Sequence, residues 1–186
     1  MKARRNAPFP FNPRSLARMG PRKLAALLLA VLLALGYSFF EHRTGDNLQG
    51  TVVRVVDGDT VIVNVDGAER RVRLIGVDTP ETVHPDKPVQ RGGKEASAFT
   101  KKNLLNRHVW LEYDAAPLDK YQRHLAYLWL GEPERSEAAI RERMFNARLL
   151  LEGYGRVITI QPNSRYAELF AEFQQEAHAA KRGLWR

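Results

Sequence analysis

The 186-residue chain contains no cysteine. This absence excludes a disulfide scaffold, cysteine-ligated zinc, an iron–sulfur cluster and thiol catalysis. It leaves the cellular compartment open, because a domain with a good core needs no disulfide. A composition of 44% hydrophobic and 27% charged residues is that of an ordinary globular domain, so a wholly disordered chain is also excluded.

Acidic residues are missing from positions 1–23, which hold seven of the 29 Lys and Arg side chains. Beyond residue 23, the remaining 22 basic side chains face 21 acidic ones, a net charge of +1. The net charge of +8 therefore belongs almost entirely to a short N-terminal arm. Any nucleic-acid function of the remainder must come from local placement of charge rather than from its total.

A run of 17 residues without charge, 24–40, follows the basic arm. As a helix it would span roughly 25 Å, slightly less than a bilayer core of about 30 Å. We predict a basic cytoplasmic arm over 1–23 and a signal anchor, a transmembrane helix, over 24–40. The alternative is a signal peptide cleaved near Ala34–Leu35–Gly36. In the first case the rest is the periplasmic or extracellular part of a single-pass membrane protein, and in the second it is secreted.

After a polar linker over 41–49, the pattern of a folded domain extends over 50–186. The β-branched runs Thr51–Val56, Thr60–Val65 and Glu69–Val77 predict three strands in an antiparallel meander, with Asp66–Gly67 as a hairpin turn. Two more strands are predicted at Val109–Tyr113 and Leu125–Leu130.

Helical patterns lie between and after these strands. Lys94–Asn106 has no helix breaker, Met144, Ala147 and Leu151 keep helical spacing before Gly153, and an apolar stripe from Tyr166 to Ala177 precedes Gly183 as a stop signal. The sequence thus predicts an α+β, mainly β domain. It is a five-stranded barrel of the OB type with three packed helices, preceded by an N-terminal hydrophobic helix.

Four acidic residues flank the first three strands: Asp57, Asp59, Asp78 and Glu81. Taken alone, Asp57–Gly58 is better interpreted as a plain turn, and the alternative for residues 78–81 is a solvated loop at the end of a strand. However, a meander can bring Asp59 and Asp78 to one end of the sheet. Clustered carboxylates repel each other unless a cation offsets their charge, and oxygen ligands favour Ca²⁺ or Mg²⁺.

Two arginines suit a phosphate beside such a cation. Arg73 lies on the strand that leads to Asp78, and Arg123 precedes the fifth strand. Either one taken alone reads as a surface salt bridge. Together, a metal ion, two guanidinium groups and a carboxylate that activates water are the parts that phosphodiester hydrolysis requires.

Five segments in order, VVRVVDGDTVIV, RVRLIGVDTPET, KEASAFTKKNL, LDKYQRHLAYLWL and LLLEGYGRV, resemble the staphylococcal nuclease (thermonuclease) family over about residues 50–186. The resemblance implies a Ca²⁺-dependent nuclease that binds one ion and cleaves DNA or RNA, leaving 3′-phosphate ends.

The resemblance also implies roles for individual residues. Asp59 and Asp78 match calcium-ligating aspartates, and Thr79 matches a position whose main-chain carbonyl binds the ion. Glu81 matches the general base, and Arg73 and Arg123 match the phosphate-binding arginines. Three further positions are Lys120 and Tyr121, near a terminal phosphate, and Asp57, which supports the metal site without ligating it.

Two departures from the family pattern concern substrate contacts. Gln122 stands where the family usually has glycine, and the segment around Thr159 lacks base-stacking tyrosines. The alternative function is a catalytically silent OB-fold module that binds nucleic acid at the membrane. All five core positions are retained (Arg73, Asp78, Glu81, Asp59 and Arg123), which favours the enzyme. Nothing in the sequence indicates an obligate protein partner, and we predict a monomer.

Overall fold

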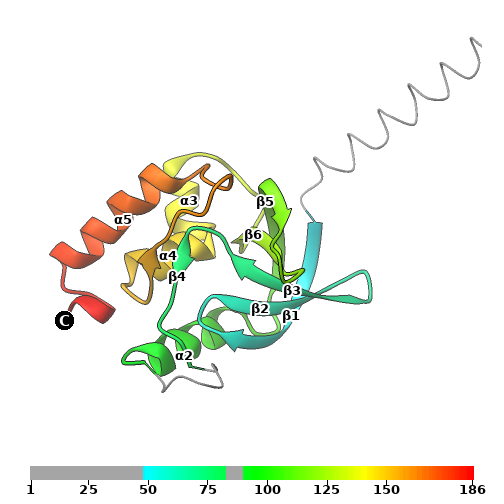
Figure 1. Ribbon diagram of the computed structural model, residues 1–186, viewed down its shortest axis with the longest axis horizontal. Coiled ribbons are helices and arrows are strands. Elements are labelled where there is room, and N and C mark those ends of the chain that lie inside the picture. The colour runs from blue at the N-terminus through cyan, green and yellow to red at the C-terminus, as the bar shows by residue number, and fades with distance from the viewer. Residues whose placement is uncertain (1–47, 83–89) are drawn as a thin grey trace, which may run out of the picture. The chain divides into compact units, whose positions relative to one another are not determined.

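The computed structural model describes residues 48–82 and 90–186 (Figure 1). They belong to one compact unit, Asn47–Arg186. The predicted basic arm, hydrophobic helix and most of the linker lie outside the described residues and stay predictions. Within the described part of the chain, no helix has the length and hydrophobicity that a membrane span requires.

Five strands close into a barrel in the order β1-β2-β3-β6-β5. All neighbours pair antiparallel except β3 and β6, which are parallel. This confirms the predicted mainly β, five-stranded barrel and its opening meander. The strands are β1 Leu48–Asp57, β2 Thr60–Val65, β3 Ala68–Leu74, β5 His108–Leu118 and β6 His124–Trp129.

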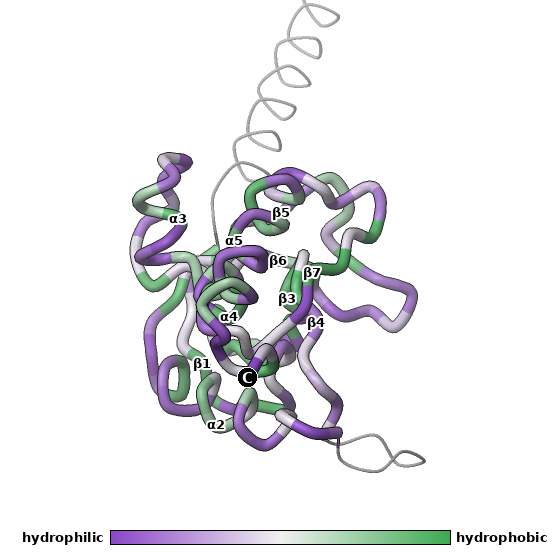
Figure 2. Tube along the Cα trace, turned by 90° about the vertical axis from the view of Figure 1, so that its left-hand side faces the viewer, coloured by the Kyte–Doolittle hydropathy of each residue, from purple (hydrophilic) through white to green (hydrophobic). Residues whose placement is uncertain are grey.

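The sequence builds the meander by local rules. In β2, Val61, Val63 and Val65 are buried in the core, and β-branched side chains favour extended backbone. Asp66 and Gly67 both have positive φ, 52° and 83°, as a tight hairpin turn between twisted strands requires. Figure 2 shows hydrophobic stretches along the strands and hydrophilic loops projecting from the domain.

Four α-helices are present in the described residues, where the sequence predicted three. The additional helix lies in the polar segment after β6 and is separated from the next helix by Met144, whose backbone is extended. The third predicted helix ends at Ala179 rather than at Gly183, which instead opens a 3₁₀ helix, η2. The helices are α2 Gly93–Leu104, α3 Glu137–Arg143, α4 Phe145–Leu151 and α5 Ala167–Ala179, and η2 covers Gly183–Trp185.

The third predicted strand, Glu69–Val77, is wrong as one element, because the chain turns after Leu74. Gly76 has φ 79°, and a Cβ there would lie 2.6 Å from the ring of Phe170 on α5, so only glycine fits. After the turn, β4 (Val77–Asp78) leaves the barrel and pairs antiparallel with β7 (Arg156–Val157). The turn therefore carries Asp78 onto a separate ladder beside the barrel.

Asn146 on α4 links this helix to the barrel through hydrogen bonds at the β3–β4 turn. Its side chain is fully buried; the amide oxygen accepts from Leu128 N at 2.9 Å, and the amide nitrogen donates to Ile75 O at 2.8 Å. One side chain thus satisfies backbone groups of β6 and of the β3–β4 turn.

Replacing Asn146 with Ala should lower the free energy of unfolding by roughly 2–4 kcal/mol, because two buried backbone groups lose their partners. Urea denaturation of the domain measures this. The exposed amide Gln49→Ala on β1 is the matched control and should change the same quantity by less than about 0.5 kcal/mol. If both substitutions lowered the free energy of unfolding equally, the hydrogen bonds of Asn146 would not stabilise the contact between α4 and the barrel.

Candidate active site

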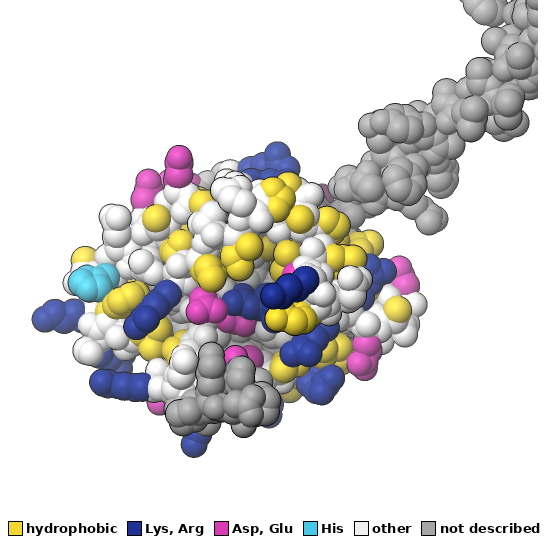
Figure 3. Space-filling model, in the orientation of Figure 1, with side chains coloured by type: hydrophobic (Ala, Val, Ile, Leu, Met, Phe, Trp, Pro, Cys, Tyr) yellow, Lys and Arg dark blue, Asp and Glu magenta, His cyan; other side chains and the backbone are white. Residues whose placement is uncertain are grey.

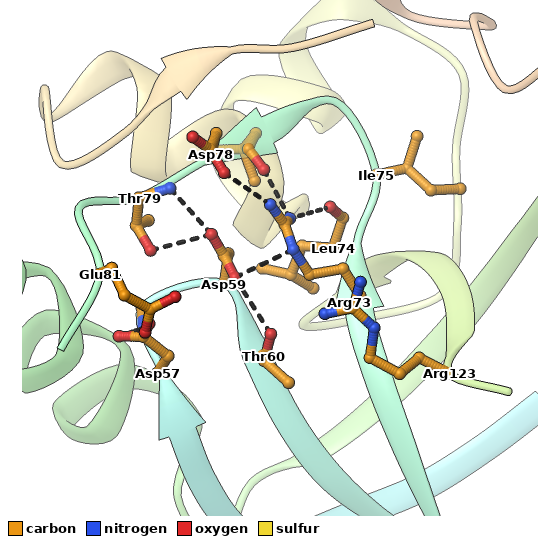
Figure 4. Close-up of polar contacts among 12 residues, drawn as sticks. Asp57, Asp59, Thr60, Arg73, Leu74, Ile75, Asp78, Thr79, Glu81 and Arg123 are labelled. Carbon is orange, nitrogen blue, oxygen red and sulfur yellow. Dashed lines mark hydrogen bonds and ion pairs between the residues drawn. The ribbon is translucent and has the colours of Figure 1, made fainter. Parts of the chain in front are cut away.

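Arg73 brings Asp59 and Asp78 together at one end of the barrel (Figure 4). Its Nε lies 3.1 Å from Asp59 Oδ1, and its Nη2 lies 2.9 Å from Asp78 Oδ1. Its Nη1 donates to the carbonyls of Leu74 and Val77, at 2.7 and 2.6 Å. The guanidinium is therefore held by both the acids and the backbone of the β3–β4 turn.

The two aspartates differ in exposure. The Asp59 side chain is only 8% exposed, whereas that of Asp78 is 57% exposed. Partial burial raises the pKa of the Asp78 carboxyl; Arg73 opposes this, and the charges of Asp59 and Asp57 add to it. The site thus holds more negative charge than Arg73 offsets.

Asp59 is fixed by the chain that follows Asp78. Its Oδ2 accepts from the Thr79 amide at 2.8 Å and from the Thr79 hydroxyl at 2.9 Å, and its Oδ1 accepts from Thr60 Oγ1 at 3.1 Å. The approach is close because Gly58 has no Cβ: one there would lie 2.6 Å from Thr79 Oγ1. The Asp57–Gly58–Asp59 turn is therefore part of the site.

Asp57 ties this turn to helix α2. Its Oδ1 accepts from Gly58 N, Thr82 Oγ1 and Ser97 Oγ, at 2.8, 2.7 and 3.0 Å. From the same helix, Thr100 Oγ1 donates to Gly58 O at 2.6 Å. Sequence reasoning missed Thr82, Ser97 and Thr100. The signals that could have indicated them are the spacing of Ser97 and Thr100 on α2 and the position of Thr82 directly after Glu81.

Glu81 follows on the loop between β4 and α2. Its amide donates to Gln90 Oε1 at 3.1 Å, and its own Oε1 accepts from Thr82 N at 3.1 Å. In Figure 4, Glu81, Asp57 and Thr79 lie on the side of Asp59 away from Arg73. Thr82 thus contacts both Asp57 and Glu81.

Arg123 is oriented by Asp119, another residue that sequence reasoning did not assign. Asp119 Oδ2 accepts from Arg123 Nε at 2.6 Å, and Oδ1 accepts from the amides of Arg123 and Tyr121, both at 2.9 Å. Burial opposes the charge of Asp119, but these hydrogen bonds outweigh it and hold its pKa below the ordinary value.

Gln122 keeps the backbone that glycine would provide in this turn. It has φ 61°, and its amide donates to Asp119 O at 3.0 Å. Glutamine therefore adopts the left-handed backbone conformation that glycine adopts freely, which costs about 1 kcal/mol of folding free energy for a residue with a side chain.

Lys120 and Tyr121 project from the same turn. Tyr121 is 68% exposed, the Lys120 Nζ lies 5.0 Å from its ring centroid, and the Arg123 Cζ lies 5.6 Å from it. The structure thus places both predicted substrate residues next to Arg123, with Tyr121 largely exposed.

An apolar hollow of about 290 Å³ joins the two halves of the site. Asp78 and Arg73 border it on one side, and Asp119 and Arg123 border it as well. Its walls are mostly apolar: Leu74, Ile75, Leu125, Ile158 and Ile160. Figure 3 shows acidic side chains near the middle of this face, with Lys and Arg side chains to both sides.

A hard cation fits the donor chemistry beside Asp78. Asp59 and Asp78 supply oxygen donors only, and their excess negative charge is what a cation would offset. Within residues 48–82 and 90–186, no group of three or more His, Asp or Glu side chains is arranged to hold a metal. A cation bound there would draw on the two carboxylates of Asp59 and Asp78, with water or substrate oxygens as its further ligands.

Comparison with known proteins identifies the family of this chain. The model of the family "Staphylococcal nuclease homologue" matches residues 71–186. The chain belongs to the staphylococcal nuclease family. It is 43% identical to "Thermonuclease" of Staphylococcus intermedius over 175 residues, covering 88% of this chain and 98% of that protein.

Two further relatives show how far the similarity to this family extends. The chain is 48% identical to "Thermonuclease" of Staphylococcus hyicus over 134 residues, which cover 72% of this chain and 73% of that one. It is also 36% identical to "SPbeta prophage-derived endonuclease YokF" of Bacillus subtilis over 137 residues, which cover 73% of this chain and 43% of that protein.

We expect Asp78→Asn to stabilise the metal-free domain at neutral pH. The pKa of Asp78 is raised in the folded state, so its ionisation above that pKa costs more in the folded than in the unfolded protein. Asparagine keeps an oxygen that can accept from Arg73. The gain should disappear as the pH falls below the ordinary aspartate pKa, where both states are protonated.

Denaturant unfolding in EDTA across the acidic to neutral range tests this. Asp66→Asn, at an exposed hairpin turn, is the control for replacing a surface carboxylate with an amide. A loss of stability in Asp78→Asn at neutral pH would show that the ion pair with Arg73 outweighs burial and the repulsion by Asp59 and Asp57.

Proposed function

We propose that this protein is a metal-dependent nuclease that hydrolyses phosphodiester bonds of DNA or RNA. The observation that carries the proposal is the convergence of Asp59 and Asp78 on Arg73, beside a hollow that Arg123 also lines. Membership of the staphylococcal nuclease family and the names of the relatives, two thermonucleases and an endonuclease, support it.

The two arginines bind the scissile phosphate in this proposal. Arg73 is held rigidly by its four contacts, so little side-chain entropy is lost when it meets a phosphate oxygen. Asp119 contacts the Arg123 guanidinium only at Nε, and no hydrogen bond or ion pair joins the two Nη atoms to any other described residue. That guanidinium edge can therefore make a bidentate contact.

The metal that we propose is a single Ca²⁺ ion, which the carboxylates of Asp59 and Asp78 and the main-chain carbonyl of Thr79 would hold. When bound, such an ion offsets charge on the phosphate oxygens and lowers the barrier to attack by water. Asp57 acts indirectly, because it fixes the turn that carries Asp59 through Gly58, Thr82 and Ser97.

Glu81 is the general base in this mechanism. Its carboxylate takes a proton from a water molecule as the water oxygen forms a bond to phosphorus. The bond from phosphorus to the 5′-oxygen then breaks, and the leaving oxygen takes a proton from solvent. The products are a 3′-phosphate and a 5′-hydroxyl, while the arginines stabilise the extra negative charge of the transition state.

The apolar hollow would take the nucleoside next to the scissile phosphate. Its aliphatic walls suit a base, and Asp119 and Asn163 are polar groups at its edge. Ile160, 64% exposed, lies in this wall and offers apolar contact in place of aromatic stacking. Lys120 and Tyr121 would contact the next phosphate or base along the strand.

Cleavage of single-stranded DNA by purified residues 47–186 should require added Ca²⁺ and stop with EDTA. In the same assay, Glu81→Gln and Arg123→Ala should each lower kcat by about 10²- to 10⁴-fold, because each removes a group that acts in the transition state.

Glu142→Gln, an exposed acid on α3, is the matched control and should retain wild-type rates. Undiminished cleavage in EDTA would overturn the metal dependence. Binding of DNA by the wild type without any cleavage would support the silent binding module instead.

We also propose that the nuclease domain acts outside the cytoplasm, tethered by residues 24–40 or released after cleavage of a signal peptide. The acid-free basic arm before an uncharged segment supports this, because such arms stay on the cytoplasmic side. Residues 24–40 would then be the contact with the membrane.

A reporter enzyme that is active only in the periplasm, fused after Gly50, should be active in a Gram-negative host. The matched control carries the same fusion with Arg4, Arg5, Arg14 and Arg18 changed to Glu, and it should lose most of that activity. An inactive wild-type fusion would refute export, and mass spectrometry of the mature N-terminus would distinguish the anchor from the cleaved form.

A further inference from the structure

A second hollow, about 210 Å³ in volume, adjoins the acidic site. Asp78 and Thr79 line it together with Arg91 and Arg156, and apart from Asp78 it shares no lining residue with the apolar hollow. Asp78 lines both this hollow and the apolar one. The proposed scissile position therefore has open space on two sides.

A larger groove of about 720 Å³ follows, and it shares Arg91 and Arg156 with the second hollow. It runs between the start of α2, the strand β7 and the 3₁₀ helix η2. We call it the arginine groove, after four arginines among its lining residues: Arg91, Arg156, Arg182 and Arg186. In Figure 3, Lys and Arg side chains project at the lower left, where Figure 1 places the C-terminal segment.

The charge of this groove is not neutralised by its own acids. Glu95 and Glu152 are the acidic residues among its lining, against the four arginines. Within the described part of the chain, no ion pair involves any of those four guanidinium groups. The domain beyond residue 23 is nearly neutral as a whole, so this cluster is a local concentration of positive charge.

The groove is attached to the acidic site by backbone pairing. Arg156 lies opposite Asp78 in the ladder of β4 and β7, so the ladder that carries Asp78 also carries one of the arginines. The guanidinium of Arg156 lies 5.8 Å from the centroid of the Trp185 ring, and Arg182 Nη1 donates to Leu151 O at 2.9 Å. These contacts orient two of the cations relative to the site.

We propose that the arginine groove binds backbone phosphates of the substrate strand beyond the scissile bond, on the side away from the apolar hollow. This rests on the proposed nuclease function and adds to it an extended binding track for a single strand. A positively charged groove without base-reading geometry follows the backbone and is insensitive to sequence. The enzyme would therefore favour long strands over dinucleotides.

Steady-state kinetics on two substrates test this: a dinucleotide and a single-stranded 12-mer. In Arg156→Gln/Arg182→Gln, the ratio of kcat/KM for the 12-mer to kcat/KM for the dinucleotide should fall about tenfold, mainly through KM for the 12-mer. The dependence of log KM on log salt concentration should also become shallower by about 1, as expected when one or two phosphate contacts are lost.

Two variants serve as controls. Lys102→Gln/Arg107→Gln removes two exposed positive charges from the far end of α2 and the turn after it, and it should leave the ratio within about twofold of wild type. Arg156→Lys/Arg182→Lys keeps the charges and should recover most of the lost ratio. Thermal unfolding of each variant separates loss of binding from loss of fold.

The outcomes distinguish the two proposals. If the wild type fails to cleave the dinucleotide and the 12-mer with Ca²⁺, the nuclease function itself is refuted. If the wild type cleaves both substrates and the Arg156→Gln/Arg182→Gln ratio stays within twofold of wild type, the arginine groove proposal is overturned and the nuclease function stands.

Discussion

The guanidinium of Arg73 holds together groups that would otherwise repel each other. Asp59 belongs to the turn after β1, and Asp78 belongs to β4 on a separate ladder; each contributes an oxygen about 3 Å from the same side chain. Arg73 also binds the carbonyls of Leu74 and Val77, so the turn that positions Asp78 closes around the arginine that contacts it. One side chain therefore both offsets the charge of the two aspartates and holds the backbone of the β3–β4 turn. A cation would offset the negative charge of the two aspartates that Arg73 leaves unbalanced.

Most of the barrel could be predicted from the sequence, because it follows local rules. The β-branched runs of β1 and β2 and the Asp66–Gly67 turn are read directly from the chain. The break at Gly76 could not be read in this way, since it depends on the ring of Phe170, which lies almost a hundred positions further along the chain. The polar segment that forms α3 lacks an apolar period, and only Ser136, which caps it, marks its start.

Within the site, the sequence predicted which acids and arginines would be candidates, and it missed the residues that orient them. Asp119 looks like an ordinary turn residue until its three hydrogen bonds to Tyr121 and Arg123 are seen. Thr82 and Ser97 are small hydroxyl residues of the kind that cover any protein surface. Such roles arise from contacts between distant segments, so motif spacing does not reveal them. The resemblance to a family supplied the expected residue roles, and the structure shows which of these residues lie together: Asp59 and Asp78 at Arg73, and Lys120 and Tyr121 beside Arg123.

The short ladder of β4 and β7 has a consequence for how this enzyme can change over evolution. It pairs Asp78 with Arg156, so a residue of the acidic site and a residue of the arginine groove share one pair of strands. Insertions or deletions in the segment that follows β7, residues 158–163, would reshape the wall of the apolar hollow without altering that pair. In the nuclease that we propose, such changes would alter the contact with the base and leave in place the ladder that carries Asp78 and Arg156.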